Sequence, residues 1–313
     1  ANGMDVKAAE ITEDSLVAAE DTNVGNESVD IQQQEPVEIS ELETTENNDL
    51  SKSSESITVD ESIAEDILAT QADTAVVVGT VSDYLTAKGD AKLYNINLPA
   101  GVYLQAQLTT PANADLDYDL YLLDAEGNIL TGSDYYTYIN GTAGTLPEAL
   151  GYITSGDTAT YYLYVLASEG GSVSESFTLD YSVSTACDSY EIDESVRQAL
   201  AFTYGAGGAY IESRNLSSPI DNDWYVITVP SSRIYDKLKI SATTASTNTC
   251  SVEVYQNVAS EGYQMKRVGS GNTISVSSGK YYIRVSNAKT MENFDDLDIQ
   301  NYKLSITPIL KAT

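Results

Sequence analysis

The second half of this chain repeats the first. Residues 94–99 read Tyr-Asn-Ile-Asn-Leu-Pro and residues 225–230 read Tyr-Val-Ile-Thr-Val-Pro. Residues 161–165, Tyr-Tyr-Leu-Tyr-Val, are echoed by Tyr-Tyr-Ile-Arg-Val at 281–285, and Phe-Thr-Leu at 177–179 by Tyr-Lys-Leu at 302–304. The order of the echoes is kept while the loop lengths differ. A repeat of domain size predicts two copies of one fold.

Within each copy the hydrophobic pattern has a period of two. Apolar and polar residues alternate over 102–108 and again over 177–183, and turn sequences such as Pro-Ala-Gly at 99–101 separate the runs. Alternation of this kind is typical of strands with one buried face. We therefore expect an all-β chain with two tandem antiparallel β-sandwich domains, jelly-roll-like, at 75–186 and 187–313. The junction is expected at 187–194, followed by a short helix within 194–202.

Residues 1–74 differ in kind from the rest. Residues 1–75 hold 20 acidic and two basic residues, and the first aromatic residue is Tyr84. A segment with high net charge and no aromatic side chains buries too little apolar surface to offset its ordering entropy. The sequence therefore predicts a disordered acidic tail, with a transient helical turn at 61–69.

Charge and composition exclude several functions. The net charge is −31, with 47 acidic against 16 basic residues, so nucleic acid is not an expected partner. The chain has no histidine, which removes Ser-His-Asp and Cys-His nucleophiles and His-ligated zinc. No apolar run approaches the length of a membrane span. A glycosidase would need one particular carboxylate pair, and none stands out, so we expect no catalysis.

The composition indicates where in or outside the cell the protein is located. The chain begins Ala-Asn-Gly without an initiator Met, which fits a processed protein whose signal peptide has been removed. Few cysteines, no histidine and an acidic, Tyr-rich composition indicate an extracellular or cell-surface bacterial protein. Cys187 and Cys250 are either one disulfide or two buried thiols, and sequence alone leaves both open.

Several segments resemble the bacterial pre-peptidase C-terminal (PPC) domain, a family that includes the collagen-binding modules of clostridial collagenases. The similar stretches are Asp-Ala-Lys-Leu-Tyr-Asn-Ile at 90–96, Ala-Asp-Leu-Asp-Tyr-Asp-Leu-Tyr-Leu-Leu-Asp at 114–124, Asp-Ser-Tyr-Glu-Ile-Asp-Glu-Ser at 188–195 and Asp-Asn-Asp-Trp-Tyr at 221–225. Together they extend over most of residues 75–310. The resemblance implies a jelly-roll-like sandwich that serves as an extracellular accessory module, often stabilised by calcium.

The resemblance also implies metal ligands. Calcium in such modules is held by acidic residues of the leading segment and a loop carboxylate. By position, Glu191 and Asp193 are implied ligands, with Asp221 or Asp223 as partners.

A second acidic feature belongs to the first copy alone. Asp115, Asp117 and Asp119 would share one face of a strand, with carboxylates about 7 Å apart. Calcium needs six to eight oxygens at about 2.4 Å, which a straight strand does not gather, so a solvated or hydrogen-bonded face is favoured over a metal site. The second copy has Thr247, Thr249 and Ser251 at the corresponding positions. No Lys or Arg lies between Lys92 and Arg197, so only solvent cations, a metal or another domain can neutralise this region.

Aromatic residues supply the candidate ligand-binding surface. Tyr135, Tyr136 and Tyr138 lie in a polar stretch that reads as a loop, and exposed tyrosines are common at protein and sugar recognition surfaces. Packing at the sandwich edge is the simpler alternative. Trp224, the single tryptophan, is expected in core or inter-domain packing.

The function expected from sequence is a non-catalytic secreted or surface protein. Its two modules would bind an extracellular protein or carbohydrate, with calcium stabilising at least one of them. A structural spacer or surface-layer-like component without a specific ligand is one alternative. An accessory or inhibitory subunit for a separate protease is another. The ligand and the oligomeric state are not indicated by the sequence.

Overall fold

The structure is a computed structural model. It describes residues 76–133, 146–202, 208–231, 234–244, 250–259, 263–294, 299 and 301–312, together with three short strands nearer the N-terminus. Those strands are β1 (Lys7–Ala8), β2 (Ile31–Gln33) and β3 (Ser54–Ser56). Apart from them, the predicted acidic tail and its helical turn at 61–69 lie outside the described residues. The predicted ligand-binding residues Tyr135, Tyr136 and Tyr138 lie outside them as well.

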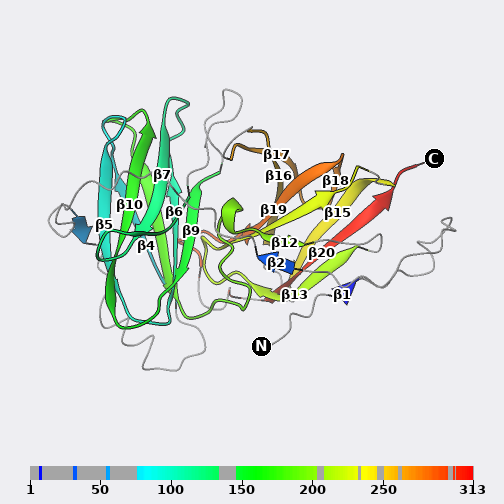
Figure 1. The fold of residues 1–313 in the computed structure, drawn as a ribbon, viewed down its shortest axis with the longest axis horizontal. Coiled ribbons are helices and arrows are strands. Elements are labelled where there is room, and N and C mark those ends of the chain that lie inside the picture. The colour runs from blue at the N-terminus through cyan, green and yellow to red at the C-terminus, as the bar shows by residue number, and fades with distance from the viewer. Residues whose placement is uncertain are drawn as a thin grey trace.

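The first module is a sandwich of two sheets (Figure 1). One sheet has the order β4-β11-β6-β9, with β4 (Val76–Asp83), β11 (Phe177–Ser184), β6 (Tyr103–Thr109) and β9 (Glu148–Ile153). The other has the order β3-β5-β10-β7-β8, with β5 (Ala91–Leu98), β10 (Ala159–Glu169), β7 (Asp117–Leu123) and β8 (Ile129–Ser133).

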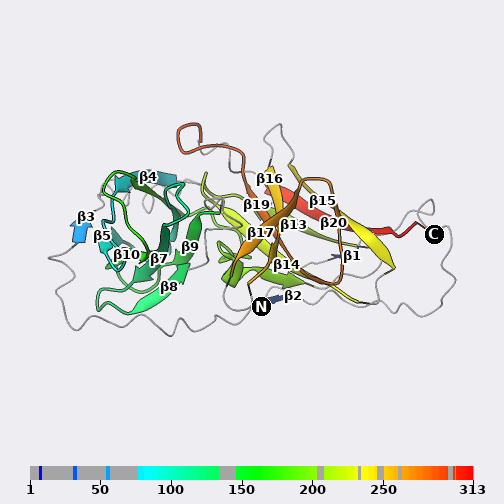
Figure 2. The ribbon, with the colours of Figure 1, turned by 90° about the horizontal axis from the view of Figure 1, so that it is seen from above.

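The second module repeats this two-sheet plan and lies beside the first (Figures 1 and 2). Its first sheet has the order β1-β13-β20-β15-β18, with β13 (Ala209–Asn215), β20 (Asn301–Leu310), β15 (Tyr235–Thr244) and β18 (Thr273–Ser275). Its second has the order β17-β16-β19-β14-β12-β2, with β17 (Met265–Ser270), β16 (Cys250–Asn257), β19 (Gly279–Asn287), β14 (Asn222–Val229) and β12 (Leu200–Phe202). The pairs β12–β14 and β3–β5 are parallel, and the other strand pairs of the described residues are antiparallel. The predicted tandem β-sandwich fold is confirmed.

The register of the strands confirms the internal repeat. In the first module Tyr161 pairs with Ile96, and in the second Tyr281 pairs with Ile227 at the same place in the ladder. Likewise Val165 pairs with Leu120, as Val285 pairs with Val252. The echoed sequences therefore occupy the same positions in the two sandwiches. The apolar pattern fixes this register, since a shift by one residue would turn every apolar side chain outward.

Each sandwich has its own apolar core between its sheets. Tyr94 and Leu163 belong to the core of the first module, and Tyr225 and Ile283 occupy the matching places in the second. These side chains are at most 1% exposed. Leu104 and Leu179, from the two runs in which apolar and polar residues alternate, are fully buried in the core of the first module as well.

The junction between the modules is irregular chain followed by one turn. Residues 187–195 form no strand or helix, and Val196–Gln198 form a single 3₁₀ turn, η2, before β12 begins. The helix expected within 194–202 is therefore wrong in extent. Trp224 is buried in a cluster with Val196 and with Leu146 of the first module, which agrees with the expected core or inter-domain packing.

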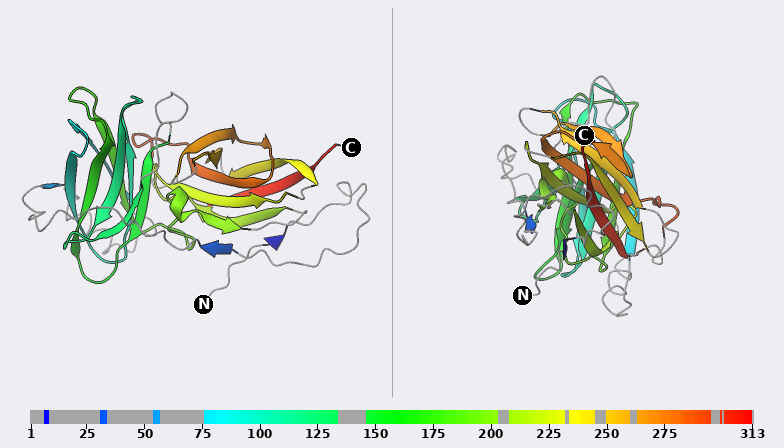
Figure 3. Two further views of the ribbon diagram at one scale, coloured as in Figure 1. Left: turned by 45° about the horizontal axis from the view of Figure 1, so that its top comes forward. Right: turned by 90° about the vertical axis from the view of Figure 1, so that its right-hand side faces the viewer.

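Two further expectations are answered by the described residues. Cys187 and Cys250 are both free thiols, so the structure favours the second of the two readings that the sequence left open. In the part of the chain that the structure describes, no helix is long and apolar enough to cross a bilayer. Figure 3 gives two further views of the chain, and its left view shows the two sandwiches side by side.

We predict that the core of the first module depends on Leu163. This side chain is fully buried in β10, the strand between β5 and β7, so Leu163→Ala should lower the free energy of unfolding by about 2–5 kcal/mol. Leu310→Ala, at a residue that is 50% exposed, is the control and should change it by less than about 0.5 kcal/mol. Urea unfolding followed by circular dichroism measures both, and equal losses would contradict the assigned core.

Candidate functional site: a buried acidic cluster at the module junction

Carboxylates from two separate segments meet at the end of the second sandwich that faces the first module. Glu191, Asp193 and Glu194 come from the junction, and Asp221 and Asp223 lie at the start of β14. Asp193, Asp221 and Asp223 have no exposed surface, Glu194 is 1% exposed, and the side chain of Glu191 is fully buried. The structure thus brings together the four metal ligands that the PPC resemblance implies, and it adds Glu194.

A β-bulge places Arg214, the one cation among the described residues that pairs with these carboxylates. Ile211 and Arg214 in β13 both point inward, although residues three apart in a regular strand face opposite sides. The pairing of β13 with β20 shifts between these two residues, and Ser213 has a φ of 61°. Bulges re-aim side chains in this way, and here the bulge turns a guanidinium into the sandwich.

Arg214 is completely buried and uses its whole guanidinium. Nε donates to Asp188 at 2.7 Å, Nη1 donates to Asp193 at 2.9 Å, and Nη2 donates to the other oxygen of Asp193 at 3.2 Å. Nη2 also lies 3.0 Å from Asp223 Oδ1 and 3.7 Å from Glu191 Oε1. The fork on Asp193 is the bidentate geometry that holds a guanidinium most firmly.

Two core tyrosines extend this network into the sandwich. Nη1 of Arg214 donates to the Tyr225 hydroxyl at 2.9 Å, and the Tyr225 and Tyr302 hydroxyls are 2.7 Å apart. Tyr302 in turn donates to Asp223. Tyr225 is the echo of Tyr94, whose hydroxyl donates to Asp83 at 2.9 Å. The same core position therefore carries a hydrogen-bonded tyrosine hydroxyl in both modules, with a half-buried partner in the first.

The other half of the cluster has no cation of its own. Glu191, Glu194 and Asp221 offer carboxylate oxygens that lie within 4.8 Å of one another. Among the described residues, Arg214 is the one cation in an ion pair with any of the cluster's carboxylates, and it reaches only Glu191 of these three. Asp221 Oδ2 accepts from the backbone N–H of Ser217, whereas Asp221 Oδ1 has no hydrogen-bond partner.

The first module closes this half. Tyr103 and Gln105 point outward from β6, yet they are 1% exposed because they contact the junction. The Tyr103 hydroxyl lies 2.7 Å from Glu194 and 2.8 Å from Glu191, and Gln105 also donates to Glu194. The Tyr103 hydroxyl has one proton and can donate it to only one of these two carboxylates. The other carboxylate must therefore be protonated or lie beside a cation.

Close approach of the modules requires a glycine at position 151. A Cβ added there would lie 2.6 Å from the side chain of Glu194 and 2.7 Å from the Tyr103 hydroxyl. Gly151 in β9 therefore makes room for the junction against the first module.

Burial shifts the pKa values of the cluster strongly. Burial raises the pKa of Glu194 to about 7, and it raises the pKa of Glu191 and Asp221 well above the ordinary values, with neighbouring carboxylates adding to the effect. Burial alone would lower the pKa of Arg214, but Asp193 and Asp223 outweigh it and hold the guanidinium charged. Six ionised carboxylates, Asp188 included, would leave a net charge of −5 around this one guanidinium.

The residues present suit a metal ion in one half of the cluster and exclude it from the other. Arg214 already occupies the space between Asp193 and Asp223. In the other half the possible ligand atoms are all carboxylate oxygens, and they have the spacing that ligands about 2.4 Å from one ion would have. One of them, Asp221 Oδ1, is buried and has no hydrogen-bond partner among the described residues. The cation-free half, Glu191, Glu194 and Asp221, is therefore the part of the cluster that suits a metal.

The aspartates of the first module form a separate group. Asp115 lies exposed before β7 begins at Asp117, so the three do not share one strand face as expected. Asp117 and Asp119 are buried rather than solvated, and their oxygens approach Glu148 of β9. Asp119 accepts from Ser168 and Tyr121, which agrees with the hydrogen-bonded alternative. At the matching place in the second module Ser251 is exposed.

Sequence analysis missed the residues that complete the junction cluster. The sequence did not indicate Arg214, because its inward direction depends on the bulge. It did not indicate Tyr103 and Gln105 either, because their face of β6 is buried only by contact with the other module. Glu194 carried the one available signal, since it follows Glu191 and Asp193 in the leading segment.

Comparisons with known proteins give no family. No protein-family model matches the chain, and no curated protein matches it. Among solved structures it is similar to the periplasmic g-type lysozyme inhibitor PliG of Aeromonas hydrophila, at 13% identity over 37% of this chain and 90% of that one, with a TM-score of 0.21. It is also similar to the CUB1-EGF-CUB2 domains of human MASP-1/3, at 11% identity over 74% of this chain and 99% of that one, with a TM-score of 0.22. The tandem CBM51 modules of Sp3GH98 from Streptococcus pneumoniae give 10% identity over 72% and 83%, with a TM-score of 0.24. Likenesses this distant carry no argument about function.

We predict that Arg214 is essential for stability. Arg214→Gln removes the guanidinium and leaves buried carboxylates without a partner, so the free energy of unfolding should fall by about 3–5 kcal/mol. Arg267→Gln, which removes a half-exposed ion pair with Glu253 in the same module, should cost less than about 1 kcal/mol. Chemical unfolding of the second module measures both changes. A loss for Arg214→Gln no larger than that of its control would refute the network.

We also predict a pH dependence that traces to Glu194. Its folded pKa of about 7 lies above the ordinary value of 4.5, so the folded protein keeps a proton that the unfolded chain loses. Without metal, stability should therefore fall as pH rises from about 4.5 to 7 and change little beyond, by the order of 3 kcal/mol from this group. Glu194→Gln should flatten that slope, whereas Glu126→Gln at an exposed site should not. Identical slopes in both variants, measured by urea unfolding in chelator, would contradict the assignment.

Proposed function

We propose that this protein is a non-catalytic extracellular or cell-surface binding protein whose two β-sandwich modules bind a protein or glycan and whose junction holds calcium. The observation that supports it best is the buried junction cluster, where six carboxylates meet one guanidinium. A calcium ion held by Glu191, Glu194 and Asp221 would supply the missing positive charge.

The position of the cluster supports a structural role over a catalytic one. Strongly shifted pKa values mark catalytic sites when the groups line a cleft that a substrate can enter. Here the shifted carboxylates are at most 1% exposed or have fully buried side chains, so a substrate has no access to them. Buried ion networks shift pKa values without catalysis, and this one links two modules through Tyr103 and Gln105.

Calcium also connects the cluster with the proposed location. Calcium-binding modules outside cells bind with dissociation constants of about 10⁻⁴–10⁻³ M, a range suited to the ion's extracellular level. Such a site would keep the modules joined outside the cell. Tyr135, Tyr136 and Tyr138 remain proposed ligand-binding residues on sequence grounds. A spacer without ligand is the alternative, and silence in screens of collagen, mucin and glycans would favour it.

Calcium should stabilise the wild-type protein against heat. We predict that millimolar calcium raises the melting temperature relative to excess EGTA, because the ion binds the folded cluster and not the unfolded chain. Asp221→Asn, which removes a charge from the cation-free half, should abolish most of that increase. Asp157→Asn changes an exposed aspartate by the same charge and should keep it. Differential scanning calorimetry measures the shift.

The choice of Asp221 matters for this experiment. Asp193 is bound to Arg214 on both oxygens, so its replacement would destabilise the protein with or without calcium. Equal melting temperatures in calcium and EGTA for the wild type would overturn the calcium part of the proposal.

A further inference from the structure

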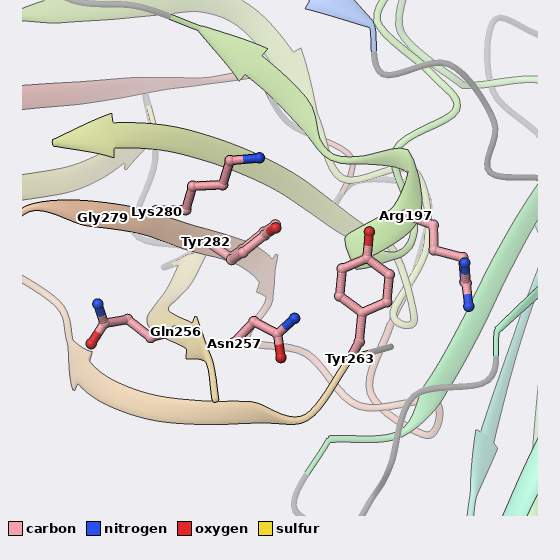
Figure 4. A pocket seen from close by; sticks show the side chains of 7 residues that line it. All are labelled: Arg197, Gln256, Asn257, Tyr263, Gly279, Lys280 and Tyr282. Atoms are coloured by element: carbon pink, nitrogen blue, oxygen red, sulfur yellow. The ribbon is translucent and has the colours of Figure 1, made fainter. Parts of the chain in front are cut away.

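An open cavity of about 560 Å³ lies in the second module where β16 ends and β19 begins (Figure 4). Its lining comes from four places in the chain. Arg197 belongs to η2, Tyr263 precedes β17, and the remaining residues lie in β16 and β19: Gln256, Asn257, Gly279, Lys280 and Tyr282. The volume is within the range of small-ligand sites, about 300–1,000 Å³.

The charge of this lining is opposite to that of the protein. The chain has 47 acidic and 16 basic residues, yet the seven lining residues include Arg197 and Lys280 and no Asp or Glu. Lys280 has no ion pair with any carboxylate of the described residues. An anion that the acidic remainder of the protein repels meets two cationic side chains here.

The aromatic side chains shape a surface beside these cations. The Arg197 guanidinium lies over the Tyr263 ring, with its carbon 5.1 Å from the ring centre, and Figure 4 shows the two side by side. This stacking orients the planar guanidinium, which binds carboxylates through two parallel N–H groups. Tyr282, which is 5% exposed, contributes a second ring from β19. Flat aromatic faces with a hydroxyl at the edge suit the mixed apolar and polar surface of a sugar.

Two amides complete the lining. Asn257 Oδ1 accepts from the backbone N–H groups of Ala259 and Gln264, at 3.1 and 2.9 Å, and so holds the chain beyond β16 in place. The Gln256 amide makes no hydrogen bond with the described residues and offers both a donor and an acceptor. Sugar hydroxyls need both kinds of partner.

We propose that this cavity binds a saccharide that carries an anionic group. Arg197 and Lys280 bind the anion, Tyr263 and Tyr282 pack against the ring, and Gln256 bonds its hydroxyls. The inference rests on the proposed binding function and names the ligand class and the site for it. A bare inorganic anion would use the two cations but not the aromatic and amide lining.

Isothermal titration calorimetry of the full chain, with calcium present, tests the proposal. The probes are sialyllactose with lactose as its neutral counterpart, galacturonic acid oligosaccharides, and sulfated heparin disaccharides. We expect the anionic sugars to bind, lactose to bind at least about tenfold more weakly, and affinity to fall as salt rises. The carboxylated and sulfated probes show which anionic group the cavity prefers.

Variants assign the binding to this cavity. Lys280→Gln and Arg197→Gln should each weaken binding about tenfold or more, since each removes a charged hydrogen-bond donor. Lys239→Gln, at an exposed lysine of β15 in the other sheet of the module, should leave the affinity unchanged. Melting temperatures of all three variants report whether the fold is intact.

The outcomes separate this inference from the broader proposal. Anionic saccharides that bind equally to the wild type and to both cavity variants would overturn the site while leaving a binding protein. No binding of any anionic saccharide would overturn the inference. The comparison of melting temperatures in calcium and EGTA tests the calcium site at the junction independently of either result.

Discussion

The burial of Arg214 among carboxylates is the interaction on which the second module and its contact with the first depend. Removing a guanidinium and several carboxylates from water costs desolvation free energy, and only close, directional ion pairs and hydrogen bonds offset that cost. Arg214 achieves this with a fork on Asp193 and further contacts to Asp188 and Asp223. It serves one side of the cluster and leaves the side at Glu191, Glu194 and Asp221 with excess negative charge.

This excess negative charge makes the stability of the protein depend on pH, and would make it depend on a bound metal ion, through the same carboxylates. Burial raises the pKa of Glu194 and favours its protonated form, and a metal ion bound there would take the place of the proton. The hydrogen bonds of Tyr103 and Gln105 to Glu194 make the same group part of the contact between the modules. The same segment also carries Arg197, three residues beyond Glu194, so the junction positions one wall of the basic cavity.

The repeat in the sequence predicted the fold well because it reports on core strands. Tyr94 and Tyr225 occupy matching core positions, and the two ladders have the same register around Ile96 and Ile227. The site was predicted only in part. The leading segment and the start of β14 supplied Glu191, Asp193, Asp221 and Asp223 through a family resemblance. Period-two reasoning could not place Arg214, because a bulge breaks the period just before it. Nor could it show that the outward face of β6 is buried, since that burial depends on a contact between modules.

The ionisation state of Glu194 is the quantity that tests the central claim most directly. Carbon-13 NMR of the side-chain carboxyl, followed over pH in the full chain, reports it without any substitution. In chelator the carboxyl of Glu194 should titrate near pH 7, and in saturating calcium it should stay ionised to far lower pH. Titration near pH 4.5 in both conditions would show that the junction carries no uncompensated charge and would contradict the account.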